Sequence, residues 1–296
     1  MQVWLNEMTI RKTIESESFP SVEAMLSAYR PEAPVYCLRK KKIQGNASRF
    51  VNMFPGTVLY AVKCNPHPFV LDACYGGGIC HFDVASLAEV KLISDRYKSS
   101  VGYFQHPVKS RSAIRDSYRL YGVRHYAVDH LDEFSKIMDE IDDANDVTVY
   151  VRLATPPGGA SEHLSNKFGA SIDEAVSLLS RVQSAGCCPA LSFHVGSQCY
   201  DPRSYQTALS MVAETLRRGN VRIGALDVGG GFPASYPNME SPPLGEFIKT
   251  IVEGVRVIAV DDEITLLCEP GRALVADGVS VVTKIYLRRG DRLYIN

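Results

Sequence analysis

The sequence has almost no excess of charge of either sign. It contains 32 lysine and arginine residues against 33 aspartate and glutamate residues, which gives a formal net charge of -1. Proteins that bind nucleic acid or anionic membranes usually carry a strongly basic signature, so we expect neither partner. The one basic run, residues 39–42, is interpreted as a solvated helix face and not as a nucleic-acid patch.

Long apolar runs and paired metal-binding cysteines are missing as well. No stretch approaches the length of a membrane span, and the first 15 residues lack the apolar core of a signal peptide. We therefore expect a cytoplasmic protein without a membrane partner. The eight cysteines include no C-x-x-C pair and no histidine at zinc-finger spacing, so we expect no metal and cysteines that mostly act as small buried hydrophobic residues.

The sequence does contain a repeat. Between residues 58 and 272, short apolar runs alternate with longer amphipathic segments, a pattern typical of parallel strands connected by helices. Eight such units favour an α/β fold of the (β/α)8 TIM-type barrel class over an open doubly wound sheet, because no G-x-G-x-x-G follows the first strand. The expected strands begin at Val58, His81, Val101, His125, Val147, Ala190, Ala225 and Thr265, and the expected helices span residues 86–97, 110–122, 130–141, 171–186, 201–219 and 243–257.

Two regions lie outside this repeat. Residues 1–33 precede the barrel segment, residues 34–272, and are interpreted as an N-terminal arm that ends near PEAPVY. Residues 273–296 contain what we predict to be two β-strands. They suggest a C-terminal all-β domain that this chain only begins.

Polar residues stand at the C-terminal ends of the expected strands, where barrels of this kind build their active sites. We therefore expect these side chains to meet in one site, with Asp83 and Arg152 as an ion pair. The residues are Lys63, Asp83, Arg152, His194, Ser197, Gly229, Gly230, Gly231, Glu269 and Arg272.

The glycine run in DVGGGFP predicts a phosphate site. Three glycines after a strand let backbone N–H groups approach an anion closely, although the same run is also compatible with a plain tight turn. Arg272, one loop later, would supply the balancing positive charge. Ser197 is expected either to reach this phosphate or to act as a simple cap.

Glu269 and Lys63 indicate what the phosphate is attached to. A carboxylate at the end of an apolar strand is costly to bury unless it has a cationic or hydrogen-bonding partner, and a protonated pyridine nitrogen would be such a partner. A lysine in a partly desolvated site would have a lowered pKa and could form an imine with an aldehyde, whereas the alternative is an ordinary surface lysine. His194 would either stack on a flat ring or serve as a hydrogen-bonded core histidine. A phosphate cradle, a ring-nitrogen acid and an imine-forming lysine are what pyridoxal 5′-phosphate requires.

The motifs YAVKCNP, FDVAS followed by Glu89, LSNKFG, FHVGSQ, DVGGGFP and CEPGR, in this order, resemble the fold-type III pyridoxal-phosphate decarboxylases, which include ornithine, diaminopimelate and arginine decarboxylases. The resemblance spans residues 34–296, and GGGFP and FHVGSQ are more similar to the ornithine/lysine branch. It implies decarboxylation of ornithine or lysine to its diamine, in polyamine biosynthesis. Diaminopimelate or arginine decarboxylation and a non-catalytic regulatory homologue are the alternatives. Glu269 argues against a racemase, which would place an arginine at the ring nitrogen, and the strands after the barrel argue against a single-barrel cofactor carrier.

The resemblance also implies a role for each site residue. Lys63 would bond the cofactor, His194 would stack on its ring, and Glu269 would pair with its nitrogen. The phosphate would be held by Ser197, Gly229, Gly230, Gly231 and Arg272, whereas Asp83, Glu89 and Arg152 would surround the lysine and ring. Lys167 would help a homodimer contact, with active sites at the interface. Family members take substrate contacts and a phosphate-side tyrosine from a later part of their chains, so the resemblance leaves the substrate open.

Overall fold

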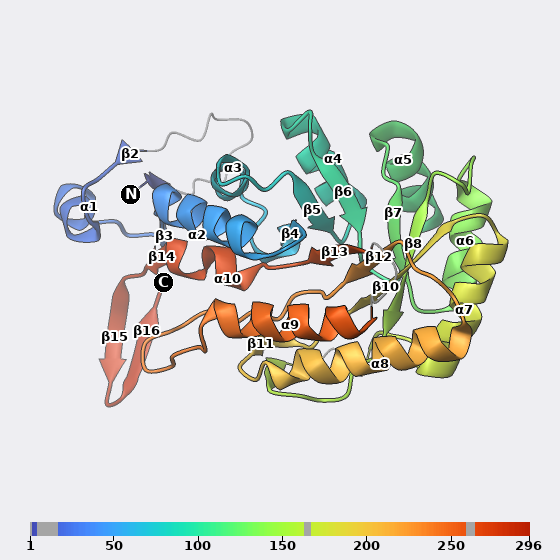
Figure 1. Ribbon diagram of the computed structural model, residues 1–296. Coiled ribbons are helices and arrows are strands. Elements are labelled where there is room, and N and C mark those ends of the chain that lie inside the picture. Colours follow the sequence, from blue (N-terminus) through green and yellow to red (C-terminus); the bar gives the residue numbers. More distant parts are fainter. Residues whose placement is uncertain (1, 5–16, 163–166, 259–263) are drawn as a thin grey trace.

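Eight parallel strands form a closed barrel in the computed structural model, which describes residues 2–4, 17–162, 167–258 and 264–296 (Figure 1). Each of the eight predicted strands is present, so the predicted (β/α)8 architecture is confirmed. Around the barrel the strand order is β10-β12-β13-β4-β5-β6-β7-β8. These strands are β4 (Thr57–Ala61), β5 (His81–Val84), β6 (Val101–Phe104), β7 (His125–Val128), β8 (Thr148–Leu153), β10 (Cys188–Phe193), β12 (Ala225–Asp227) and β13 (Thr265–Cys268).

The strands are apolar on both faces because each has two environments to fill. In β4 the side chain of Leu59 belongs to the core inside the barrel, whereas Val58 and Tyr60 pack in the larger core between barrel and helices. This alternation follows from the two-residue period of a strand. The inner core consists of Leu59, Tyr103, Ala127, Tyr150, Ala190, Ala225 and Leu267.

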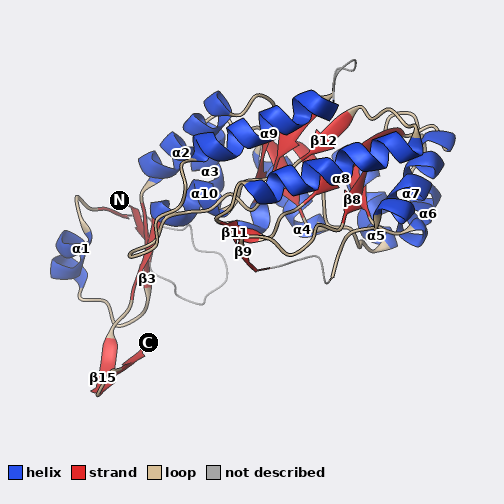
Figure 2. Cartoon of the chain, turned by 60° about the horizontal axis from the view of Figure 1, so that its bottom comes forward, coloured by secondary structure: helices blue, strands red, loops and turns tan. Residues whose placement is uncertain are grey.

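Helices cover the outside of the barrel, and several of them begin at a serine whose side chain caps the first turn. In α7, the Ser171 N–H donates to Glu174 Oε2 (2.8 Å) while the Ser171 side chain accepts from the Glu174 N–H, which is a complete capping box. Helices α8 and α9 lie side by side on one flank (Figures 1 and 2). The helices are α2 (Lys40–Met53), α3 (Pro68–Gly76), α4 (Leu87–Arg96), α5 (Arg111–Tyr121), α6 (Leu131–Glu140), α7 (Ile172–Ser184), α8 (Arg203–Gly219), α9 (Leu244–Ile258) and the short α10 (Arg272–Val275).

A second, antiparallel sheet joins the two ends of the chain beside the barrel, with strand order β14-β3-β1-β2. Strand β3 lies within residues 34–272, which the sequence analysis assigned to the barrel, but it pairs with β14 in this second sheet. The domain boundaries at residues 33 and 272 stay predictions. After residue 272 the structure has a short helix and three strands, so the prediction of two strands there was wrong in number. The elements are β1 (Gln2–Trp4), β2 (Glu17–Ser18), α1 (Val22–Tyr29), β3 (Val35–Leu38), β14 (Val279–Val282) and the hairpin of β15 (Ile285–Arg289) and β16 (Arg292–Ile295).

A third small sheet borders the mouth of the barrel. It pairs β9 (Ala160–Glu162) antiparallel with β11 (Ser197–Cys199) and brings Ser197 and Gln198 to the C-terminal strand ends. Within the described ranges, no helix has the length and apolar character needed to cross a membrane. The same residues include no group of three or more histidine, cysteine or acidic side chains placed to hold a metal ion. All eight cysteines are free, and five of them are buried.

Candidate active site

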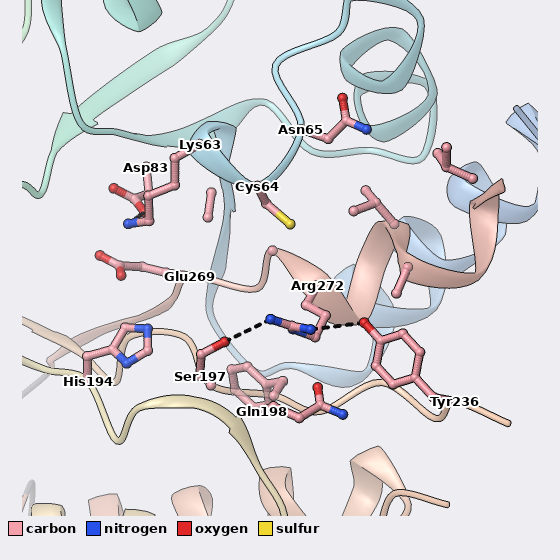
Figure 3. Close-up of a pocket in the computed structure, with 17 residues that line it drawn as sticks. Lys63, Cys64, Asn65, Asp83, His194, Ser197, Gln198, Tyr236, Glu269 and Arg272 are labelled. Carbon is pink, nitrogen blue, oxygen red and sulfur yellow. Dashed lines mark hydrogen bonds and ion pairs between the residues drawn. The ribbon is translucent and has the colours of Figure 1, made fainter. Parts of the chain in front are cut away.

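A cavity of about 610 Å³ opens at the C-terminal ends of the barrel strands (Figure 3). Seven of the residues predicted from the sequence line it together, although they come from distant parts of the chain. They are Lys63, Asp83, His194, Ser197, Gly231, Glu269 and Arg272. Lys63, Asp83, His194 and Glu269 lie at one end of the view, and Arg272 lies toward the other, with Ser197 between them.

Lys63 and Asp83 form an ion pair at the deep end of this cavity. Lys63 lies in a 3₁₀ turn (Val62–Cys64) directly after β4, and its Nζ donates to Asp83 Oδ2 at 2.8 Å. The Lys63 side chain is 54% exposed to the open cavity, whereas that of Asp83 is fully buried. Burial lowers the pKa of Lys63, but the charges of Asp83 and Glu269 outweigh it, so the pKa lies above its ordinary value. The expectation of a lowered lysine pKa was wrong because two carboxylates face the amine.

Arg152 does not pair with Asp83 as the sequence suggested. Among the described residues, the ion pair of Asp83 is with Lys63. Arg152 instead lies over the Phe168 ring, with 5.3 Å between the guanidinium carbon and the ring centroid. Burial lowers the pKa of Arg152, while Glu269 and Asp83 raise it. Arg152 therefore contributes positive charge behind the cavity wall.

Glu269 has a second carboxyl group beside it that the sequence interpretation did not assign. Asp227, at the end of β12, is fully buried and close enough to Glu269 for the two carboxyl groups to influence each other's pKa. Its Oδ1 also accepts from the Gly229 N–H at 2.8 Å. Burial raises the pKa of Glu269 well above its usual range, and the nearby Asp227 raises it further. The position of Asp227, an acid ending a strand directly before the glycine run, was the signal that could have identified it.

His194 is a neutral ring that faces the cavity. Burial lowers its pKa well below the usual value, and the positive charges of Arg152 and Lys63 act in the same direction. Its Nδ1 accepts from the Gly196 N–H at 3.0 Å, which places the proton on Nε2. The fixed, uncharged imidazole is suited to contact the face of a flat ligand.

The glycine run packs so closely that side chains would not fit. A Cβ on Gly230 would lie 2.7 Å from the Glu269 carbonyl oxygen and 3.0 Å from His194 Nε2. Gly231 has φ +104°, and a Cβ there would lie 2.5 Å from the Gly196 carbonyl oxygen. The Gly229 N–H is donated to Asp227, but those of Gly230 and Gly231 donate to no described residue. Two N–H groups are thus free to bind a ligand.

Arg272 lies at the other end of the cavity between two hydroxyl groups. Its Nη2 donates to Ser197 Oγ at 3.3 Å and its Nη1 to Tyr236 Oη at 3.0 Å (Figure 3). Its Nε is buried without a partner among the described residues. Tyr236 was missed by the sequence interpretation because it lies in the irregular loop before α9, where no periodicity or motif marks it.

Glu89 and Lys167 lie outside the cavity lining, as do Arg152, Gly229 and Gly230. Glu89 accepts the Ala85 N–H at 2.7 Å, and its own N–H is capped by Ser86, so it fixes the start of α4 behind the ion pair. Lys167 is exposed beside a segment, residues 163–166, that lies outside the described residues; the first three residues of LSNKFG fall there. Its predicted dimer contact stays a prediction.

Comparison with known proteins gives a consistent match. Residues 40–276 match the model of the pyridoxal-dependent decarboxylase family, pyridoxal binding domain. The chain is 32% identical over 234 residues to the lysine/ornithine decarboxylase of Selenomonas ruminantium, which covers 77% of this chain and 58% of the relative. It is 30% identical over 256 residues to antizyme inhibitor 2 of Xenopus laevis, an alignment that covers 81% of this chain and 53% of the relative.

Solved structures give the same match in three dimensions. A lysine/ornithine decarboxylase from Vibrio vulnificus, solved in complex with cadaverine, superimposes with a TM-score of 0.78 at 28% identity. That superposition covers 93% of this chain and 72% of the other. The chain spans about half the length of the curated relatives it matches.

Proposed function

Because this chain belongs to the family of pyridoxal-dependent decarboxylases, we propose that it binds pyridoxal 5′-phosphate and decarboxylates a basic amino acid, ornithine or lysine. The observation that carries the proposal is the arrangement of the cavity. One end holds a lysine and carboxyl groups, and the other holds an arginine, two hydroxyls and Gly231, whose N–H has no acceptor among the described residues. The named relatives support ornithine and lysine as the substrates to test first.

The residues present fit this cofactor in three respects. Asp83 Oδ1 and Arg272 Nε are buried polar atoms without partners in the described part of the chain, and a bound ligand is one way to satisfy such atoms. The glycine run packs tightly against the neighbouring backbone and leaves the N–H groups of Gly230 and Gly231 without an acceptor among the described residues. Finally, the pKa of Glu269 is raised although Lys63 and Arg152 act against this, and no described cation forms an ion pair with it, so a cationic ring nitrogen would favour its charged form.

Each residue would then have a defined task. When bound, the cofactor supplies an electron-withdrawing ring that accepts the electron pair left by departing carbon dioxide. Lys63 would anchor the cofactor, and Asp83, 2.8 Å from its Nζ, would take up the amine proton. Glu269 would hold a proton on the ring nitrogen, and His194 would cover one face of the ring. Arg272 would bind the phosphate, with Ser197, Gly230 and Gly231 as further donors.

A second candidate is a regulatory homologue without catalytic activity. The likeness to antizyme inhibitor 2 of Xenopus laevis is the observation that favours it. A regulator has no need of the Lys63–Asp83 pair or of Glu269, and this chain retains all three in one cavity. We therefore place the enzyme first.

The test measures cofactor attachment and carbon dioxide release in the same preparations. We expect borohydride reduction after incubation with pyridoxal phosphate to fix the cofactor on the Lys63 peptide, and Lys63→Ala to abolish this labelling. Lys249→Ala, an exposed lysine of α9, is the matched control and should label normally. Carbon dioxide release should be faster from ornithine or lysine than from arginine or diaminopimelate. Label on another peptide would refute the lysine assignment, and labelling without release from any of the four would favour the regulator.

We also infer a homodimer with active sites at the interface, with Lys167 near the contact. The family likeness supports this, and analytical ultracentrifugation of the wild-type protein and a Lys167→Glu variant tests it. A monomeric wild-type protein would count against the homodimer, and an unchanged dimer in the variant would count against the contact of Lys167. A cytoplasmic location stays a prediction from the sequence.

A further inference from the structure

The three polar side chains at the outer end of the cavity form a connected group. Arg272 donates one hydrogen bond to Ser197 Oγ and one to Tyr236 Oη, at 3.3 and 3.0 Å. All three side chains line the cavity, and Figure 3 shows the guanidinium between the two hydroxyls. Arg272 forms no ion pair with any described carboxylate, so its charge is available to a ligand.

The hydrogen atoms of the two hydroxyls are also available. A guanidinium has donors only, so the tyrosine and serine oxygens must be the acceptors in both bonds. A hydroxyl that accepts in this way still has its own hydrogen to donate. Neither Tyr236 Oη nor Ser197 Oγ donates to any acceptor among the described residues. At this end of the cavity Arg272 and both hydroxyls can therefore donate to a ligand.

The loop that carries Tyr236 is held in place by Gln198. The Gln198 side chain donates to the Ala234 carbonyl oxygen at 2.5 Å and accepts the Ala234 N–H at 3.1 Å. Gln198 has φ +55°, a conformation unusual for a residue other than glycine, and its side chain is buried. Beyond Ala234, the backbone of Tyr236 makes two hydrogen bonds of 2.9 Å with Met239. The backbone that carries the Tyr236 side chain is thus held by hydrogen bonds to Gln198 and Met239.

We propose that the Tyr236 hydroxyl donates a hydrogen bond directly to the phosphoryl group of the cofactor. This inference rests on the proposed function and extends it to a residue outside the recognised motifs. Tyr236 would complete a set of donors made by Arg272, Ser197 and the N–H groups of Gly230 and Gly231. A dianion surrounded by such donors is bound by charge-assisted hydrogen bonds, which are stronger than neutral ones.

The test compares two ligands that differ only in the phosphoryl group, pyridoxal 5′-phosphate and pyridoxal. Equilibrium dialysis gives the Kd of each ligand for the wild-type protein, Tyr236→Phe and the control Tyr294→Phe. Tyr294 lies on β16 and is 45% exposed, against 40% for Tyr236. We expect Tyr236→Phe to weaken pyridoxal phosphate binding by about tenfold or more, to leave pyridoxal binding unchanged, and to keep the wild-type melting temperature. Tyr294→Phe should behave as wild type with both ligands.

Three results would overturn the inference. The first is an unchanged Kd for pyridoxal phosphate in Tyr236→Phe. The second is an equal loss of affinity for both ligands, which would place the tyrosine against the ring. The third comes from an Arg272→Met background: if Tyr236→Phe has no further effect there, the tyrosine acts only by orienting the arginine. A wild-type protein that binds pyridoxal phosphate no more tightly than pyridoxal would instead refute the proposed function itself.

Discussion

Replacing Asp83 by asparagine should change the acidity of Lys63 without changing its position. The two side chains are joined by a single hydrogen bond of 2.8 Å between Nζ and Oδ2. Asparagine has nearly the same shape and can still accept that hydrogen bond, so the substitution removes mainly the negative charge. The expected result is a lower pKa of Lys63.

The size of this change follows from the geometry. At 2.8 Å, two unit charges attract each other by about 1.5 kcal/mol at the dielectric constant of water and by about 6 kcal/mol at an effective value of about 20. Since the Lys63 side chain is 54% exposed to the cavity, solvent screening favours the lower end. One pKa unit corresponds to about 1.4 kcal/mol, so we expect the pKa of Lys63 to fall by about one to two units.

Competitive acetylation measures this pKa in the protein without cofactor. Trace acetic anhydride is applied over a range of pH, and mass spectrometry quantifies the modified Lys63 peptide, with the exposed Lys249 as the internal standard. In the wild-type protein Lys63 should react only at strongly alkaline pH, because Asp83 and Glu269 raise its pKa. A Lys63 pKa that is the same in Asp83→Asn and wild type, with both proteins folded, would refute the reasoning that the ion pair controls this amine.

Further variants test the deep end of the cavity, the glycine run and the stability of the ion pair. Glu269→Gln should retain bound cofactor but slow carbon dioxide release by about 100-fold or more, as the loss of a transition-state charge partner does; equal turnover numbers would contradict the role of Glu269. Gly230→Ala should lower the free energy of unfolding by about 1–3 kcal/mol, because its Cβ would lie 2.7 Å from the Glu269 carbonyl oxygen. The control is Gly45→Ala in α2, where an added Cβ would have no atom within 4 Å. In the same urea titrations its free energy of unfolding should rise by about 0.5–1 kcal/mol. An unchanged free energy of unfolding in Gly230→Ala would contradict the close packing. Because the pKa of Lys63 is raised, the stabilisation from its ion pair should persist at neutral pH and disappear as the pH rises through that raised value. The free energies of unfolding of wild type and Asp83→Asn, measured by urea titration, should therefore become equal only above about pH 10.5. Equal values already at pH 8 would contradict a raised pKa of Lys63.

The barrel could be predicted because each strand has its own recognisable pattern in the local sequence. Each strand is a short apolar run, and several of the helices begin at their own capping residue, so an error in one unit does not affect the next. The antiparallel sheet was harder, since its strands come from both ends of the chain. β3 pairs with β14, about 240 residues later in the sequence, and no local pattern encodes so distant a pairing.

The members of the site could be predicted, but not all of their pairings. Strand-end position selects Lys63, Asp83 and Arg152 alike, whereas their contacts depend on strand order. β4 and β5 are neighbours, with Ala61 opposite Asp83, which brings Asp83 beside Lys63. Arg152 follows on β8, three strands further around the barrel from β5. Asp83 therefore forms its ion pair with Lys63, which follows the neighbouring strand β4, and not with Arg152.

Charge complementarity connects these separate observations. At the deep end, three carboxyl groups, Asp83, Asp227 and Glu269, stand against two cationic side chains, Lys63 and Arg152. Burial disfavours the third negative charge, and the raised pKa of Glu269 is the result. At the outer end, Arg272 has hydroxyl acceptors but no described carboxylate partner. A ligand with a cationic group at one end and an anionic group at the other would balance both ends at once. Pyridoxal phosphate, with a protonated ring nitrogen and a phosphate, has this distribution of charge, whereas an uncharged cofactor would leave both imbalances in place.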